Sequence, residues 1–183
     1  MFFLSADPGI ANFGISIIDN SKKFNVIETV IISNNRKFTD EEKIVESMYG
    51  SRVVKILSIV NKINELLDKY KKIEVIILEA PFYSALTPVS YGALLEVISS
   101  IKYQIVIPRN LPFKLIEPLL VKKIFTNKGM ANKEAMKQFL IKKVEEKIIH
   151  LPTEIDSLSE HEIDAIAIGF VYHLSLSYTP NAI

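Results

Sequence analysis

The 183-residue chain contains no cysteine. This absence excludes disulfide scaffolds, cysteine-rich zinc sites and thiol nucleophiles, and it fits a reducing cytoplasm, where we expect the protein to work. Long apolar runs are absent too, since no stretch approaches the roughly 20 residues of a membrane span. The apolar start lacks a basic flank and breaks at Asp7, so we expect no signal peptide.

A large excess of charge of either sign is also missing, because the net charge is +1. The charges are nevertheless unevenly distributed. Nine lysines stand against four acidic residues between Lys114 and Lys147, an excess of five positive charges, whereas Asp40 to Glu46 is acidic. A polyanion would meet the lysine-rich region. Lysines that only keep a helix face solvated would give the same pattern.

The first third of the chain predicts strands and then a helix. Hydrophobic residues make up 49% of the sequence, enough for one domain with a full core, and we place that domain at residues 1–183 with a loose tail from about residue 175. Turn residues join three strand-like stretches into an antiparallel meander. These stretches are Phe2–Ala6, Ile15–Ile18 and Phe24–Ile32. Helical periodicity then runs from Ile44 to Leu67, and Gly50 is either tolerated within that helix or marks a break.

The rest of the chain alternates between predicted strands and helices. Ile73–Leu78 predicts a strand parallel to the first, because a helical crossover leads into it. Tyr103–Ile107 has the β-branched content of a strand but continues a helix, so both readings stay open. The remaining elements are a strand at Phe113–Ile116 and helices at Pro88–Ser100, Leu119–Phe125, about Lys133–Ile149 and Glu160–Leu174.

Four polar side chains stand where predicted elements end or begin. Asp7 ends the first strand and Glu79 ends the fourth, and the carboxyl ends of parallel neighbours meet at the edge where α/β sheets bind ligands. His161 and Asp164 lie on one face at the start of the last helix. Three carboxylates and an imidazole suit Mg²⁺ or Mn²⁺. Without a cation, such clustering raises carboxylate pKa values and is costly.

Each of these residues also has a simpler explanation when taken alone. Asp7 precedes a Pro-Gly turn, and Asp164 suits the positive end of a helix dipole. A histidine at the start of a helix, such as His161, is more often a structural residue than a metal ligand. The metal-site hypothesis accounts for all four residues together and for their order in the chain.

At these positions the sequence resembles the RuvC-type Holliday junction resolvases of the RNase H-like superfamily. The resemblance rests on Asp7-Pro-Gly after an apolar strand, on Glu79 at the end of the fourth strand, and on His161-x-x-Asp164 opening an apolar helix. It runs from residue 3 to about residue 172. It implies an RNase H-like α/β domain, with a five-stranded mixed sheet flanked by helices on both faces.

The resemblance also implies partners and chemistry. It predicts a homodimer, joined near Pro88–Ile107, that nicks four-way or other branched DNA in symmetric pairs and leaves 5′-phosphate ends. Two Mg²⁺ ions per active site, or Mn²⁺, would be bridged by Asp7, while Glu79 and Asp164 hold one ion each. His161 would bind an ion or position the attacking water. The sequence does not tell whether a branch-migration motor is a partner.

The same resemblance assigns DNA contacts. Phe82 takes the place of the aromatic that the family inserts at the junction core, although an aromatic after a loop proline is more often a core residue. Lys122 and Lys133 have the spacing of two backbone-binding lysines of the family. Weaker candidates for DNA contact are Tyr83, Lys123, Lys128 and Arg109.

The position of His161 departs from many members of the family, which carry Asp there. Because a protonated imidazole cannot bind a metal ion, we expect activity to fall below about pH 6.5. An unchanged acid limb of the pH–rate profile in a His161→Asp variant would contradict this expectation. Glu160 and Glu162 are spare ligands on either side.

Two alternative functions remain open, and a third is excluded by the length of the chain. The chain could be another RNase H-like nuclease that cuts RNA–DNA hybrids or flaps. It could instead be a non-catalytic module that binds branched DNA, although such a module has no need for these carboxylates. An actin-like nucleotide-binding protein also begins with an Asp near Gly, but that architecture needs two such domains and this chain is too short for them.

Overall fold

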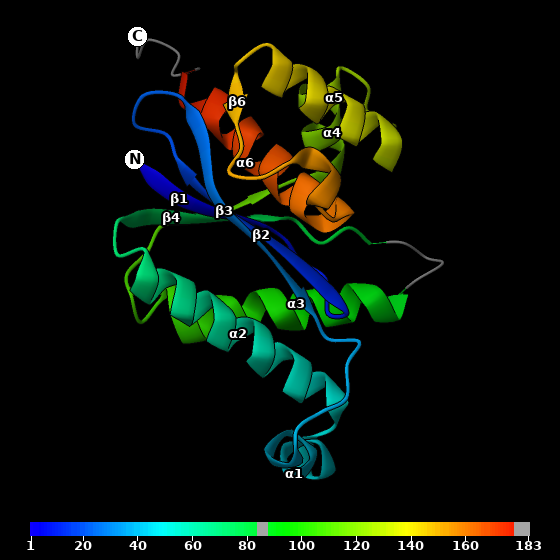
Figure 1. The fold of residues 1–183 in the computed structure, drawn as a ribbon. Helices are drawn as coiled ribbons and strands as arrows, with labels where there is room; N and C mark the ends of the chain where they lie inside the picture. The colour runs from blue at the N-terminus through cyan, green and yellow to red at the C-terminus, as the bar shows by residue number, and fades with distance from the viewer. Residues whose placement is uncertain (84–87, 178–183) are drawn as a thin grey trace, which may run out of the picture.

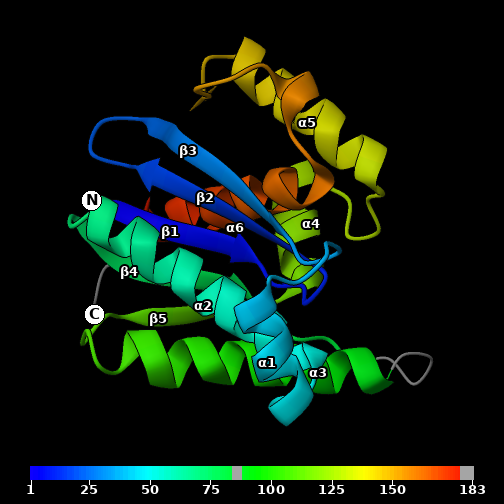
Figure 2. The same ribbon diagram turned by 60° about the horizontal axis from the view of Figure 1, so that its bottom comes forward.

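The first three strands form the predicted antiparallel meander. They are β1 (Phe2–Asp7), β2 (Asn12–Asp19) and β3 (Phe24–Ser33). β4 (Ile73–Glu79) lies parallel to β1, and β5 (Phe113–Ile116) lies parallel to β4, as Figure 2 shows. The computed structural model describes residues 1–83 and 88–177. Within them the sheet has the strand order β5-β4-β1-β2-β3-β6.

The predicted count of five strands is wrong by one. A sixth strand, β6 (Ile149–His150), pairs in parallel with β3 at the sheet edge. The sequence pattern placed Ile149 at the end of a helix, but α5 (Lys133–Glu145) ends four residues earlier and Lys147 adopts a positive φ of 58°. Two residues are too few to produce a strand periodicity.

Two further expectations are settled by the backbone. Gly50, with a φ of 86°, breaks the long predicted helix into α1 (Asp40–Tyr49) and α2 (Ser51–Lys69). The segment that could have been a strand is a π-helix, η1 (Lys102–Val106), which continues directly from α3 (Pro88–Ile101). Continuity with the helix therefore outweighs β-branched content in this segment.

Helices cover both faces of the sheet, as predicted. In Figure 1, α2 and α3 lie below the sheet, while α4 (Pro118–Thr126), α5 and α6 (Glu160–Ser177) lie above it. Strand alternation produces these two cores. Leu4 and Ala6 of β1 pack in the core of α2 and α3, whereas Phe3 packs in the core of α4 to α6.

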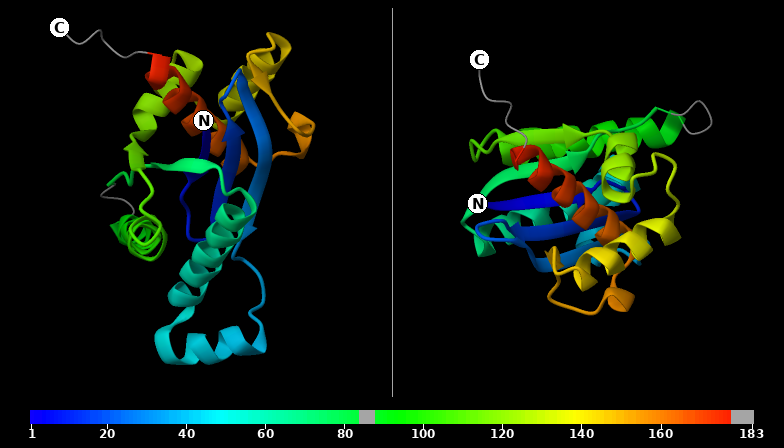
Figure 3. Two further views of the ribbon diagram at one scale, coloured as in Figure 1. Left: turned by 90° about the vertical axis from the view of Figure 1, so that its left-hand side faces the viewer. Right: turned by 90° about the horizontal axis from the view of Figure 1, so that it is seen from above.

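The last helix crosses the sheet diagonally in the right-hand view of Figure 3. It is preceded by a short 3₁₀ turn, η2 (Ile155–Ser157), within the predicted loop. α6 continues through residues 175–177, and the rest of the tail that we expected to be loose, residues 178–183, lies outside the described part of the chain. Among the described helices, none combines the length and the apolarity that a membrane crossing requires.

Candidate active site

Asp7 and Glu79 lie side by side at the carboxyl edge of the sheet. β1 and β4 are parallel neighbours in which Ala6 stands opposite Leu78, so the next residue of each strand is an acid. In Figure 1 these strand ends and the first turns of α6 lie on the same side of the molecule. The structure therefore brings Asp7 and Glu79 together with the start of the helix that carries His161 and Asp164.

A glycine on β2 lets the start of α6 approach this edge. Gly14 pairs with Asp7 across the β1–β2 ladder. A Cβ atom added at Gly14 would lie only 2.1 Å from the carbonyl oxygen of His161. Further along, the buried Ser5 hydroxyl donates a hydrogen bond to the carbonyl oxygen of Ala165 at 2.8 Å. Small residues on the sheet thus place His161 directly over Asp7.

His161 contacts Asp7 directly. Its Nδ1 atom lies 2.7 Å from Asp7 Oδ2, and its Nε2 atom lies 3.7 Å from Glu160 Oε1. The hydrogen bond that the His161 ring donates to Asp7 is the main cause that raises the pKa of His161, and partial burial opposes it. The Asp7 contact fixes which ring nitrogen faces the carboxylate cluster and leaves Nε2 toward Glu160.

The surroundings of Glu79 and Asp164 disfavour the charged forms of both carboxylates. Burial, with the charges of Asp7 and Asp164, raises the pKa of Glu79 to about 8. Burial and the charge of Asp7 raise the pKa of Asp164 to about 6. Lys122 opposes both shifts, so its ammonium lies near the cluster. Carboxylates packed together with so little compensating charge are what a divalent cation site requires.

The donor set therefore fits one or more hard divalent cations, with three carboxylates and one imidazole. As the side chains stand, however, no three His, Asp or Glu residues among those described are gathered tightly enough to hold an ion. The hydrogen bond between His161 Nδ1 and Asp7 Oδ2 occupies two atoms that could otherwise coordinate an ion. Metal binding at these four residues stays a prediction.

Comparison with known proteins turns on the fold, since the sequence matches no protein-family model and no curated protein. Thermus thermophilus RuvC in complex with a Holliday junction substrate superposes with a TM-score of 0.66 at 18% identity, covering 96% of this chain and 94% of that one. The yeast mitochondrial Holliday junction resolvase gives 0.63 at 13%, covering 96% and 82%. The fowlpox virus resolvase complexed with junction DNA gives 0.51 at 23%, covering 96% and 99%.

The chain has the fold of the RuvC-type resolvases. The predicted fold class, an RNase H-like domain, is confirmed despite the extra strand. This likeness extends over almost the whole chain.

A residue that the sequence did not single out holds the backbone around the candidate site in place. The buried Asn34 donates hydrogen bonds from Nδ2 to the carbonyl oxygens of Ile10 at 3.0 Å and Lys55 at 3.3 Å. It thereby ties the loop after Asp7 to β3 and α2. No sequence signal distinguished Asn34 from its exposed neighbour Asn35, because its partners are distant in the chain.

The two spare glutamates have other partners. Glu162 is buried and accepts hydrogen bonds from the backbone N–H of Ser159 at 2.9 Å and from its hydroxyl at 2.7 Å. This is a capping box, which the Ser-x-x-Glu spacing could have predicted. Glu160 instead pairs with the ammonium of Lys133 on α5.

The predicted DNA contacts differ in their positions. Phe82 and Tyr83 follow Glu79 in the loop after β4 and are 63% and 58% exposed, so Phe82 is not the core residue of the alternative explanation. Tyr83 packs edge-on against Tyr91 of α3, with ring centroids 5.5 Å apart. Lys122 lies near the carboxylates, and Lys133 reaches Glu160.

Three weaker candidates lie elsewhere. Arg109 precedes β5, at the opposite edge of the sheet, and contacts Asn64 and Asp68 of α2 at 3.0 Å each, a position that does not favour the predicted contact. Lys123 lines an apolar groove of about 730 Å³ between β5, α4 and α6. Lys128 is exposed in the turn before α5. Their roles in DNA binding stay predictions.

Proposed function

We propose that the chain is a metal-dependent endonuclease that resolves four-way DNA junctions by paired, symmetric nicks. The observation that carries this proposal is the convergence of Asp7, Glu79, His161 and Asp164 at the carboxyl edge of a RuvC-like sheet. The solved structures with this fold include resolvases complexed with Holliday junctions.

The chemistry follows from the donor set. Asp7, Glu79 and Asp164 would hold two Mg²⁺ ions, with Mn²⁺ as an alternative, and His161 would bind an ion or position the attacking water. Two such ions, when bound, lower the barrier to phosphodiester hydrolysis by activating a water and stabilising the leaving oxygen. Asp7 orients His161 through the 2.7 Å hydrogen bond. Hydrolysis would leave 5′-phosphate and 3′-hydroxyl ends.

The DNA would approach over the loop after β4 and the start of α5. Phe82 is exposed next to the carboxylate edge, where it can stack on an unpaired base at the junction core, a contact worth about 1–3 kcal/mol. Lys122 and Lys133 would contact backbone phosphates. These assignments follow the spacing of the resolvase motifs, and the exposure of Phe82 supports them.

A homodimer would match the two-fold symmetry of a four-way junction, because its two active sites could then nick two strands at symmetric positions. By analogy with the resolvases, the interface would include α3 and η1. Val89 and Leu95 of α3 and Tyr103 and Ile107 near η1 are exposed to solvent, as an unfilled interface requires.

A comparison of substrates tests the proposal against its rivals. Purified protein is incubated in Mg²⁺ with a synthetic four-way junction, an RNA–DNA hybrid and a 5′-flap of equal length. We expect paired nicks at opposing positions of the junction and at least about tenfold slower cleavage of the other two. Preferred cleavage of the hybrid or flap would assign the chain to another RNase H-like nuclease. Binding of the junction without cleavage in any divalent metal would indicate a non-catalytic module.

A further inference from the structure

Lys133 forms an ion pair with an acid of the same chain, although most of its side chain is exposed to solvent. Its ammonium contacts Glu160 Oε1, and the same oxygen lies 3.7 Å from His161 Nε2. Lys133 is the main cause that lowers the pKa of Glu160. One carboxylate oxygen therefore stands between a candidate phosphate-binding lysine and the candidate catalytic histidine.

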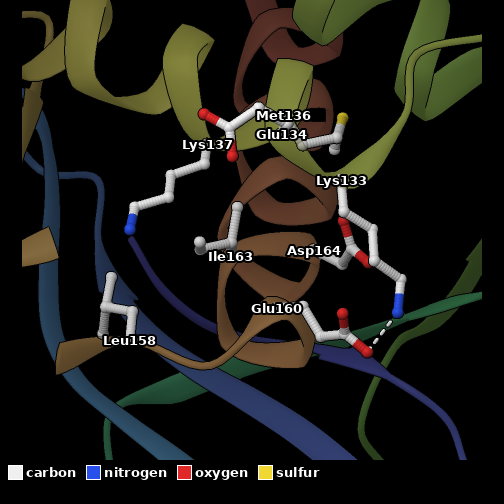
Figure 4. Close-up of a pocket in the computed structure, with 8 residues that line it drawn as sticks. All are labelled: Lys133, Glu134, Met136, Lys137, Leu158, Glu160, Ile163 and Asp164. Carbon is white, nitrogen blue, oxygen red and sulfur yellow. Dashed lines mark ion pairs between the residues drawn. The ribbon is translucent and has the colours of Figure 1, made fainter. Parts of the chain in front are cut away.

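The pair closes over a hollow of about 150 Å³ beside the site. Figure 4 shows Lys133 reaching from α5 past Asp164 toward Glu160 at the start of α6. Glu134, also on the wall of this hollow, points away from Glu160 in the same view. Its carboxylate accepts a hydrogen bond from Gln138 at 2.8 Å. Of the two glutamates on the wall of this hollow, Glu160 contacts Lys133 and Glu134 contacts Gln138 instead.

We propose that Glu160 is a positioning residue that holds Lys133 in the free protein and gives it up to a DNA phosphate. This inference rests on the function proposed above. Both partners are accessible, since the Lys133 side chain is 70% exposed and that of Glu160 is 42% exposed. A phosphate can therefore reach the ammonium and displace the carboxylate, and an exposed ion pair is weak enough to be exchanged.

The exchange has two consequences. Glu160 competes with the DNA phosphates for Lys133, so it weakens DNA binding at this point. It also keeps the lysine at the rim of the candidate active site. Once Lys133 is taken, Glu160 still has His161 Nε2 close by, 3.7 Å from its Oε1 atom. Contact with the backbone is thereby linked to the surroundings of the candidate catalytic imidazole.

A double-mutant cycle in the full chain tests the exchange. The dissociation constant of a synthetic four-way junction is measured in EDTA at low salt for the wild type, Glu160→Gln, Lys133→Met and the double variant. We expect Glu160→Gln to tighten binding about two- to fivefold, the range set by an exposed ion pair. We expect Lys133→Met to weaken binding, and the double variant to match Lys133→Met because the competitor no longer has a lysine to hold.

Glu134→Gln is the matched control, since it removes one negative charge from the same hollow without breaking the Lys133 pair. We expect it to change binding by less than about 1.5-fold. Equal tightening in Glu134→Gln, or tightening by Glu160→Gln that persists without Lys133, would mean that only overall charge matters and would overturn the proposal. No tightening in Glu160→Gln would overturn it as well.

A measurement without DNA separates this inference from the proposed function. The ¹⁵N resonance of the Lys133 ammonium and the exchange of its protons report the ion pair directly. We expect both to change in Glu160→Gln and to stay unchanged in Glu134→Gln. If the wild type binds no branched DNA, the proposed function fails while this spectrum still decides whether Glu160 holds Lys133. An unchanged signal in Glu160→Gln rejects the pair.

Discussion

Two glutamates in this protein experience opposite environments. Glu42, at the start of α1, is held by the Arg36 guanidinium and by the backbone N–H of Thr39, and these contacts lower its pKa to about 2. Glu79, at the carboxyl edge of the sheet, is buried beside Asp7 and Asp164, and its pKa is raised to about 8. The contacts of the first acid stabilise its charged form, whereas the surroundings of the second make its charged form costly.

The largest expected effect separates these two glutamates. Glu79→Gln should reduce junction nicking in Mg²⁺ by at least about 100-fold, because it removes a proposed metal ligand from the proposed nuclease site. Glu42→Gln serves as the control, and it should leave the nicking rate unchanged while lowering the melting temperature. Comparable nicking by the two variants would remove Glu79 from the mechanism.

A second variant displaces His161 and leaves all the carboxylates of the candidate site in place. Gly14→Ala should reduce nicking by at least about tenfold and destabilise the fold by about 1–3 kcal/mol, because the new Cβ atom collides with the His161 backbone. Gly129→Ala places the same methyl group in open space, in the turn before α5, and should keep activity. Full activity in Gly14→Ala would show that the position of His161 does not matter.

The pH dependence of stability tests the cost of Glu79 without any substrate. Because its pKa is about 8 in the folded protein and its ordinary value is near 4.5, the folded state binds more protons between these limits. The metal-free protein should therefore lose stability as the pH rises from about 5 to 8, by several degrees in melting temperature. Asp164, whose pKa is raised to about 6, adds to the loss at the lower end of this range.

Thermal melts in EDTA at several pH values measure this loss, and Glu79→Gln is the comparison. The variant should show a flatter profile and a higher melting temperature than the wild type at pH 8. Adding Mg²⁺ should restore more stability to the wild type at pH 8 than at pH 5.5. Identical profiles for the wild type and Glu79→Gln would contradict the raised pKa.

The smallest expected effect compares two capping boxes. Ser159→Ala removes the cap of α6, one residue before Glu160, and Thr39→Ala removes the equivalent cap of α1. Each should cost about 1 kcal/mol of stability, measured by urea unfolding. Only Ser159→Ala should also slow nicking, by about two- to threefold, because only α6 carries site residues. A larger loss of activity in Thr39→Ala would show that the activity depends on α1 rather than on α6.

The sequence predicted the parts of the site that depend on local patterns. Apolar runs that end in Asp7 and Glu79, together with the parallel crossover rule, were enough to place the two acids at one edge. Gly14, Asn34 and the Lys133–Glu160 pair escaped prediction because their roles depend on which distant backbone or side chain lies opposite. The strand β6 escaped because two residues carry no periodicity.

Nicking of a four-way junction by Asp7→Asn shows whether Asp7 takes part in the proposed catalysis. Asp7 is the residue that adjoins Glu79, holds His161 and raises the pKa of Asp164. With Mg²⁺ present, we expect the wild type to nick the junction and the variant to bind it with similar affinity but leave both strands intact. Nicking by Asp7→Asn at the wild-type rate would contradict a catalytic site at this edge of the sheet.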